Sequence, residues 1–333
     1  MVFSSFEKGK TIPAAELGAK ASELHRLREV IGQAKALVLM DLDKTLIRED
    51  YLPDDLERFT QLVDQLQGAG VTLGLHSDSP LVSLLQFAEM FQIHGPIIYE
   101  MAGIYIPQEK VNIVLNPDIA EFFQNFRIGF YHAAKARFPD LPKTKHHITY
   151  TNDKNRERRE AVTYPGFHYG LWINPYRQFS FHFWAEGIDA TGSPYLNPQF
   201  HLEVDKLARE CLAIYPAANA LPELTYRSNL DDGTSMARPR ILSSKTPAVR
   251  VLLDMIGSVP GPVYMIGDSH YDYIEDDRVT SLAVGNANAE LQNLITSSHL
   301  PSATTIDRIA IQPYTRGVIE HLENIARSVG VLY

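Results

Sequence analysis

The sequence contains one cysteine, Cys211, so no disulfide can form within the chain. A lone cysteine fits a reducing compartment, and Cys211 is interpreted as a small apolar residue of a helix rather than a catalytic thiol. No apolar run approaches the roughly 20 residues of a membrane-spanning helix. The N-terminal segment has lysines but no apolar core of signal-peptide length. We therefore expect a soluble, cytoplasmic protein that does not interact with membranes.

Positive charge is also scarce. The chain has 31 Lys and Arg residues against 40 Asp and Glu residues, which gives a formal net charge of -9. Because a nucleic-acid backbone requires a basic surface, this balance argues against nonspecific nucleic-acid binding. A small anionic substrate remains compatible with it, since a bound divalent cation and one lysine can reverse the local field.

Short apolar runs alternate with helical patterns toward both ends of the chain. A continuous run such as ALVLM (36–40) or VYMI (263–266) is typical of a parallel strand that is covered on both faces. Further strands are predicted at 71–76, 96–100 and 280–284, and helices at about 53–67, 80–91, 246–257, from 287 onward and at 315–328. This alternation predicts an α/β fold with a doubly wound parallel sheet.

The middle of the chain has a different character. Residues 104–240 hold 21 of the 33 aromatic residues, including both tryptophans. The segment 170–187 predicts two strands around the turn signal Asn174-Pro175, and helices are predicted at about 117–137 and 199–214. We predict a helical N-terminal extension (1–35), a core (36–103 and 241–333) and an inserted α+β unit (104–240).

The strongest chemical signal is MDLDKTL, which directly follows the apolar run at 36–40. Ligands of open parallel sheets bind beyond the carboxyl ends of the strands, so Asp41, Asp43 and Thr45 lie where a substrate would bind. Residues two apart in extended chain share a face, and carboxylates that close repel unless a cation separates them or one is protonated. Taken alone, these residues would also fit a turn or a helix N-cap.

A second acidic motif, IGDSHYD, follows the strand predicted at 263–266. Asp268 repeats the strand-end placement of Asp41, and Asp272 follows four residues later. Acids at the ends of two neighbouring strands provide the oxygen ligands that Mg²⁺ prefers. The alternative for this motif is a solvated loop that leads into a helix.

Two further polar residues extend the pattern. Ser77 lies at the end of the strand predicted at VTLGLH (71–76), where a hydroxyl group can donate to a phosphate oxygen. Lys245 lies at the start of a predicted helix, beside backbone donors that favour anions. Each signal is weak alone, since lone serines and lysines at loop edges are usually solvated.

Together, the four pieces resemble the haloacid dehalogenase superfamily in order and spacing. Its motifs are Asp-x-Asp-x-Thr, a strand-end Ser or Thr, a Lys, and Gly-Asp-x-x-x-Asp. The sequence is most similar to the Cof-type and sucrose-phosphatase-like branch, because Glu100-Met101-Ala102-Gly103 follows the second motif and Gly285-Asn286-Ala287 follows the fourth. The resemblance covers about 36–104 and 241–328.

The sequence departs from the branch at three places. Lys44 stands where many members have Gly, and Ser77-Asp78-Ser79 replaces the common Thr-Gly-Arg. The segment 100–103 lacks the usual Asn. These departures leave the chemistry intact and the substrate class open.

The resemblance implies a Mg²⁺-dependent phosphatase that hydrolyses a small phosphate monoester, in this branch a sugar phosphate, through an aspartyl-phosphate. Asp41 would be the nucleophile and Asp43 the acid and base. The phosphate-binding set would be Asp41, Thr45, Ser77, Asp78 and Lys245, with Ser77 and Lys245 also counted as catalytic. The Mg²⁺ set would be Asp41, Asp43 through its backbone carbonyl, Asp268 and Asp272, which orients the metal shell.

The resemblance also implies that 104–240 is a cap that selects the substrate. Its aromatic residues either stack on sugar rings or form the core of that unit; those considered are Tyr169, Trp172, Tyr176, Phe181, Phe183 and Trp184. A phosphomutase and a non-catalytic binding protein on the same fold are the alternative functions. Dehalogenation is disfavoured, because the full set of metal carboxylates indicates phosphoryl chemistry.

Overall fold

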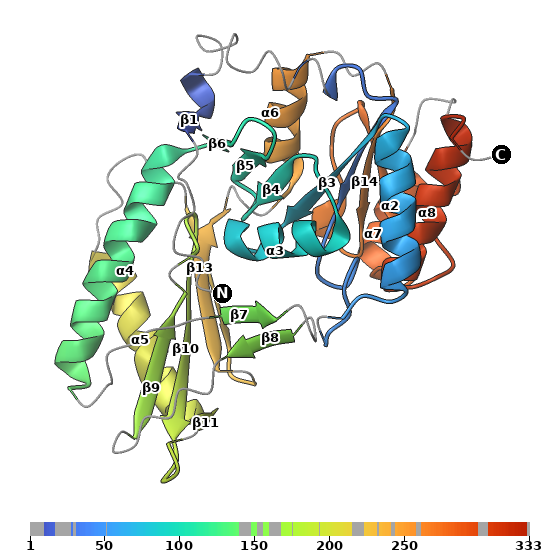
Figure 1. Ribbon diagram of the computed structural model, residues 1–333. Helices are drawn as coiled ribbons and strands as arrows, with labels where there is room; N and C mark the ends of the chain where they lie inside the picture. The colour runs from blue at the N-terminus through green and yellow to red at the C-terminus, as the bar shows by residue number, and fades with distance from the viewer. Residues whose placement is uncertain are drawn as a thin grey trace. The chain divides into compact units, whose positions relative to one another are not determined.

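The structure, a computed structural model, divides into two units (Figure 1). It describes residues 10–16, 28, 31–50, 52–139, 148–151, 156–159, 168–174, 176–192, 194–214, 223–231, 233–240, 244–257, 261–298 and 306–331. The first unit comprises the described residues within Met1–Leu115, Asn152–Arg156 and Ser243–Tyr333. The second comprises those within Asn116–Thr151 and Glu157–Leu242.

The first unit is built on an eight-stranded sheet with the order β1-β6-β5-β4-β3-β2-β14-β15. Its strands are β1 (Lys10–Pro13), β2 (Ala36–Met40), β3 (Val71–Ser77), β4 (Ile97–Tyr99), β5 (Gly103–Ile106), β6 (Val111–Val114), β14 (Val263–Gly267) and β15 (Val279–Ala283). Neighbouring strands run parallel except at the pairs β4–β5 and β5–β6, which are antiparallel. The predicted α/β core with an inserted α+β unit is confirmed, and its sheet is mixed rather than parallel throughout.

Strand β2 is covered on both faces, as its continuous apolar sequence predicts. Leu37 and Leu39 pack in one core cluster with Met265 of β14 and with α6 (Thr246–Ile256). Alternate residues of a strand face opposite sides, and Val38 and Met40 on the other face are also fully buried.

The remaining helices of the first unit are α2 (Leu56–Gly68), α3 (Leu81–Phe91), α7 (Ala289–Ser297) and α8 (Tyr314–Ser328). Helix α2 packs against β3 and lies beside α8, as Figure 1 shows. An ion pair of 2.5 Å between Arg58 and Glu323 joins these two helices. Helix α7 packs against β15. The helices predicted in both halves of the core are therefore present.

The boundary that we predicted between 103 and 104 falls inside the main sheet. Strands β5 and β6 continue this sheet, so the first unit extends to Leu115. The N-terminal range also differs from a simple helical extension, because β1 pairs with β6 and Ile12 is fully buried in the core. A single 3-10 turn, η1 (Ala14–Glu16), follows β1. Most of the predicted helical extension, residues 1–35, lies outside the described residues.

The second unit combines a five-stranded antiparallel sheet with two helices. The sheet contains β9 (Tyr169–Ile173), β10 (Phe181–Ile188), β11 (Pro194–Leu196), β12 (Leu224–Asn229) and β13 (Thr234–Pro239). The helices are α4 (Pro117–Arg137) and α5 (Pro198–Ile214), and β7 (Ile148–Thr151) pairs separately with β8 (Arg156–Arg159). The two strands predicted within 170–187 correspond to β9 and β10.

Aromatic residues form the core of the second unit. Phe181 of β10 contacts both Phe126 and Phe130 of α4, with ring centroids 4.9 Å apart in each pair. These three rings and Phe183 are fully buried. For Phe181 and Phe183, the structure therefore favours the core over the stacking on sugar rings that the sequence left open.

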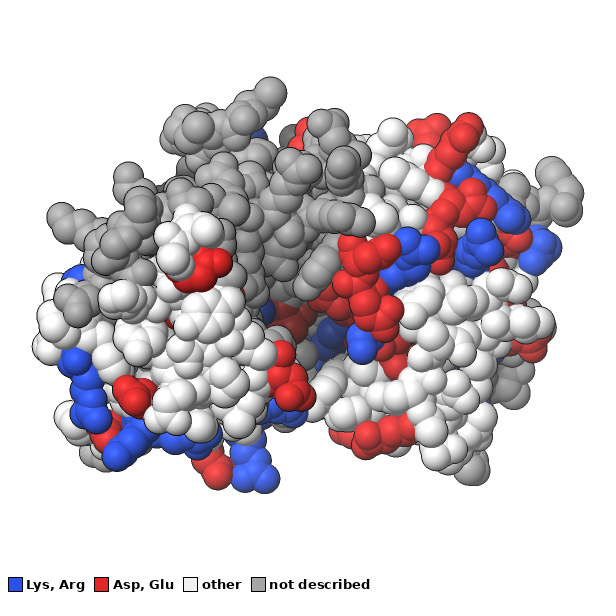
Figure 2. Space-filling model, turned by 90° about the horizontal axis from the view of Figure 1, so that it is seen from below, with Lys and Arg blue, Asp and Glu red and all other residues white. Residues whose placement is uncertain are grey.

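On the face drawn in Figure 2, charges of both signs occur side by side. Arg278, for example, forms ion pairs of 2.8 Å with both Asp254 and Asp276. Within the described part of the chain, no helix is both long enough and apolar enough to cross a membrane.

Leu39→Ala should lower the free energy of unfolding by about 2–5 kcal/mol, since truncating a fully buried leucine leaves a cavity. Leu294→Ala is the matched control, because Leu294 is 36% exposed, and we expect a change within about 0.5 kcal/mol. Urea denaturation followed by circular dichroism measures both. Equal losses in the two variants would contradict the central place of β2 in the core.

Candidate active site

Asp41 lies at the carboxyl end of β2, the strand between β3 and β14. Its backbone N–H donates to the carbonyl of Ile266 over 2.9 Å, which continues the pairing of β2 with β14 beyond Met40. The residue is only 6% exposed. The backbone pairing therefore fixes where the Asp41 carboxylate lies, at the edge of the sheet where parallel strands present their ligands.

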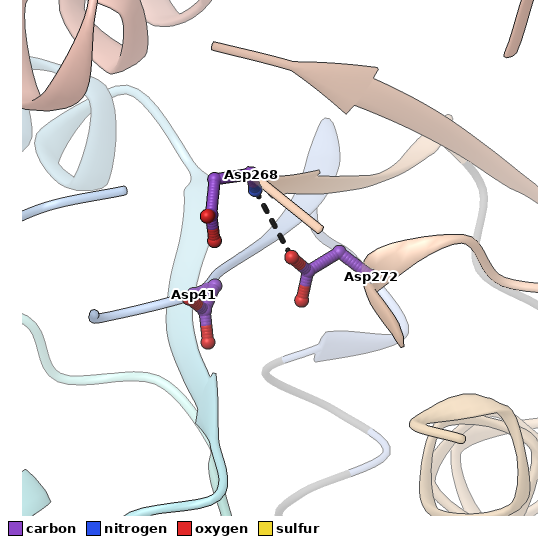
Figure 3. A group of neighbouring side chains, drawn as sticks. All are labelled: Asp41, Asp268 and Asp272. Carbon is purple, nitrogen blue, oxygen red and sulfur yellow. Dashed lines mark hydrogen bonds between the residues drawn. The ribbon is translucent and has the colours of Figure 1, made fainter. Parts of the chain in front are cut away.

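Three acids gather at this edge. Asp41, Asp268 and Asp272 each offer a carboxylate oxygen, and these oxygens all lie within 4.8 Å of one another. Figure 3 shows the three side chains grouped around one small region, with Asp268 and Asp272 contributed by the turn that follows β14. The structure thus brings together acids that are 227 residues apart in the chain.

Thr45 completes the group from the loop that follows Asp41. Its side chain is fully buried. Its hydroxyl lies 3.4 Å from Asp41 Oδ2 and 3.5 Å from Asp268 Oδ1. The loop turns tightly, because the N–H groups of Thr45 and Leu46 both donate to the carbonyl of Leu42. This turn directs the hydroxyl of Thr45 back toward the acids.

Lys245 supplies the positive charge of the site. It lies at the N-terminus of α6 and is only 2% exposed. Its Nζ donates to Asp41 Oδ1 over 2.5 Å and to the carbonyl of His76 over 2.7 Å, and it lies 2.5 Å from Asp272 Oδ1. Burial lowers the pKa of Lys245, but Asp272 and Asp41 outweigh burial and raise it above its usual value. The ammonium group is therefore charged at neutral pH.

Asp272 organises the turn after β14. Its Oδ2 accepts from the N–H of Asp268 over 3.0 Å, from the N–H of Ser269 over 2.9 Å and from the Ser269 hydroxyl over 3.1 Å. A Cβ on Gly267 would collide with this carboxyl group, so the close approach requires glycine. Since Oδ1 faces Lys245, both oxygens of Asp272 have partners within the protein, and the residue fixes the turn and the lysine.

The carboxylates of the site repel one another. Burial raises the pKa of Asp41 well above its usual value, and the neighbouring acids add to this effect against the opposing charge of Lys245. Burial, followed by Asp272, also raises the pKa of Asp268, to about 6. A divalent cation would relieve this repulsion, and a set of carboxylate oxygens suits Mg²⁺. The residues present therefore fit a Mg²⁺ ion.

Three other residues predicted for the site lie near the same strand ends. Ser77 is 1% exposed, and its hydroxyl accepts from the N–H of Ser79 over 3.1 Å. The side chain of Asp43 is exposed and accepts from the Ser79 hydroxyl over 3.4 Å. Asp78 is half-buried in the turn between β3 and α3. The contact through Ser79 thus links the loop of Asp43 to the end of β3.

Sequence reasoning missed the role of His76. Its backbone carbonyl is one of three partners of Lys245, and a backbone acceptor leaves no signal in residue type. Its side chain is fully buried. Burial, with a smaller effect of Lys245, holds the pKa of His76 well below its usual value, so the ring is neutral. Lys245 is therefore the positive charge beside Asp41, and the adjacent histidine ring adds none.

Comparisons with known proteins identify the fold. A haloacid dehalogenase-like hydrolase from Bacteroides thetaiotaomicron superimposes with a TM-score of 0.54 at 17% identity, covering 87% of this chain and 99% of that one. A protein of Thermotoga maritima gives 0.52 at 17% identity, covering 87% and 97% of the two chains. One from Geobacillus kaustophilus gives 0.52 at 15% identity, covering 90% and 100%. No protein-family model and no curated protein matches the sequence. The chain has the haloacid dehalogenase-like fold.

The raised pKa of Asp268, about 6 in the folded protein, predicts a pH-dependent effect of Asp268→Asn in metal-free buffer. An unfolded aspartate has a pKa of about 3.9. Between these values, the unfolded state releases its proton first as the pH rises, so the native carboxyl group costs stability. The gain in unfolding free energy from Asp268→Asn should be small at pH 4 and reach a plateau above about pH 6.5.

Urea denaturation in EDTA at several pH values measures this gain. Asp277→Asn is the matched control, because Asp277 is exposed, and its effect should not follow this profile. Mg²⁺ added at pH 7 should stabilise the wild type and not Asp268→Asn. A gain from Asp268→Asn that is the same at pH 4 and pH 7 would contradict the burial of an ionised Asp268.

Proposed function

We propose that the protein is a Mg²⁺-dependent phosphatase that hydrolyses a small phosphate monoester through an aspartyl-phosphate on Asp41. The observation that carries this proposal is the group formed by Asp41, Asp268 and Lys245 at the ends of two neighbouring parallel strands. A turn or an N-cap explains one acid, but it does not explain why Asp41 and Asp272, from separate segments, share a buried lysine. The haloacid dehalogenase-like fold supports a hydrolase.

Asp41 is the nucleophile in this proposal. Its carboxylate attacks phosphorus, a bond forms between the Asp41 oxygen and phosphorus, and the bond to the leaving alkoxide breaks. Lys245 Nζ donates a hydrogen bond of 2.5 Å to Asp41 Oδ1, and the positive charge of Lys245 favours the ionised form of Asp41. The same charge offsets the repulsion between a carboxylate and an anionic ester. The hydroxyl of Ser77, at the end of β3, donates to a phosphoryl oxygen.

The side chains of Asp41 and Asp268 and the backbone carbonyl of Asp43 would hold the Mg²⁺ ion. When bound, this ion neutralises charge on the phosphate oxygens. Asp272 serves that set indirectly, because its carboxylate fixes the N–H groups of the turn that carries Asp268.

Asp43 is the acid and base. It lies two residues after the nucleophile, and its side chain is exposed and can exchange protons with solvent. In the first step its carboxylic acid gives a proton to the leaving alkoxide. In the second step its carboxylate takes a proton from the water that attacks the aspartyl-phosphate, which releases phosphate and regenerates Asp41.

The substrate that we propose is a sugar phosphate, and the second unit is proposed to select it. Two features of the chain support a selecting role for this unit. It is inserted between Ser77 and Lys245, and the strands that end at the site, β2, β3 and β14, all belong to the first unit. It also carries aromatic side chains that remain partly exposed, such as Tyr169 and Tyr176 at 39% and 37%.

A phosphate-release screen over sugar phosphates and other small phosphate esters, with and without Mg²⁺, tests the proposed function. We expect Mg²⁺-dependent release by the wild type. Asp41→Asn should reduce turnover on the order of a thousandfold or more, because the nucleophile is lost, while circular dichroism shows an intact fold. Asp277→Asn removes an exposed acid of the same chain and should leave turnover unchanged.

Two results would contradict the proposal. Near-wild-type turnover of Asp41→Asn would exclude Asp41 as the nucleophile. A strict requirement for a sugar bisphosphate, with no net release of phosphate, would identify a phosphomutase instead.

A further inference from the structure

The side-chain amide of Asn286 bridges two segments next to the site. Its Nδ2 donates to the backbone carbonyl of Lys44 over 2.8 Å, and its Oδ1 accepts from the backbone N–H of Tyr314 over 2.8 Å. Asn286 lies in the loop after β15, Lys44 in the loop of the acids Asp41 and Asp43, and Tyr314 at the start of α8. One amide thus joins the loop that carries Asp41 and Asp43, here called the catalytic loop, to two later segments of the first unit.

Both residues bound by Asn286 have a left-handed backbone. Lys44 has a φ of 62° and Tyr314 a φ of 50°. Residues other than glycine adopt this region at a cost in free energy, and such residues persist where the surroundings hold them. The two hydrogen bonds of Asn286 are contacts of this kind. Because Lys44 directly follows Asp43, the conformation of Lys44 helps to set the position of the Asp43 backbone.

A neighbouring contact holds the same loop. The buried hydroxyl of Thr315 donates to the carbonyl of Leu46 over 2.6 Å and accepts from the N–H of Asp54 over 2.9 Å. Glycine at position 285 lets the loop of Asn286 approach the segment before α8, because a Cβ there would collide with the carbonyl of Ile311. Carbonyls 44 and 46 of the catalytic loop are therefore both fixed from the start of α8 and the loop before α7.

We propose that Asn286 is a positioning residue for Asp43, acting through the Lys44 peptide. This proposal rests on the proposed function. The backbone angles of Lys44 relate its bound carbonyl to the preceding peptide, which carries the carbonyl of Asp43. Without the Asn286 bond, Lys44 relaxes from its left-handed conformation. That relaxation displaces the Asp43 carbonyl, a proposed Mg²⁺ ligand, and the Asp43 side chain, the proposed acid and base.

Asn286→Ala tests this inference by kinetics and by calorimetry. Loss of a residue that orients ligands costs about 10–100-fold in metal affinity or activity. We expect kcat to fall in this range with the substrate KM nearly unchanged. Mg²⁺ affinity, measured by isothermal titration calorimetry of the protein alone, should fall in parallel. Asn293→Ala, at an exposed position of α7, is the matched control and should change neither value.

Lys44→Gly supplies a rescue experiment. Glycine adopts positive φ without the cost that lysine bears, so the loop keeps its conformation without the Asn286 bond. The double variant Lys44→Gly/Asn286→Ala should therefore recover most of the kcat and Mg²⁺ affinity lost in Asn286→Ala. A loss of thermal stability with no change in kcat or Mg²⁺ affinity, or a double variant with no recovery, would overturn the proposal.

Asn286→Asp provides a second variant if Asn286→Ala does not fold. An ionised aspartate still accepts from Tyr314 and can no longer donate to the carbonyl of Lys44. The fall in kcat at unchanged KM should persist, and a wild-type kcat would overturn the proposal. If the wild type binds Mg²⁺ but releases no phosphate from any ester, the proposed phosphatase function is wrong. The calorimetric comparison of Mg²⁺ affinity would then still test whether Asn286 positions Asp43.

Discussion

The buried ammonium group of Lys245 is the interaction on which the site depends. It contacts Asp41 after β2, Asp272 in the turn after β14, and the carbonyl of His76 in β3, while its own backbone begins α6. A charge in the protein interior requires partners, and removing one leaves the others uncompensated. The lysine therefore stabilises the fold only when these segments converge, and the same convergence builds the site.

Much of the main sheet and the charged residues of the site could be predicted from local sequence. ALVLM is apolar throughout because β2 is covered on both faces, and the acids that follow it mark the carboxyl edge of the sheet. Strands β5 and β6 were not predicted, since the turn before β5, residues 100–102, contains no glycine or asparagine. That turn places Glu100 and Met101 at φ values of 46° and 57°, a conformation that neither residue favours.

The contacts that complete the site carry even less signal in the sequence. Lys245 donates to a backbone carbonyl of residue 76, and Thr315 donates to one of residue 46. Every residue has a carbonyl group, so no residue type marks these acceptors. Asn286 belongs to a recognisable Gly-Asn-Ala segment, yet its hydrogen bond to Lys44 depends on a left-handed backbone at Lys44 that the residue type does not indicate. Sequence therefore predicted the charged groups and missed what orients them.

The order of strands in the main sheet has a consequence for synthesis of the chain on the ribosome. Strand β2 ends at residue 40, whereas its neighbour β14 begins at residue 263, after the whole second unit. Until that late strand emerges, the nascent chain presents a fully apolar strand with one unpaired edge, and such edges invite association with other chains. Chaperone protection of the growing polypeptide would then matter most while the inserted unit is being translated.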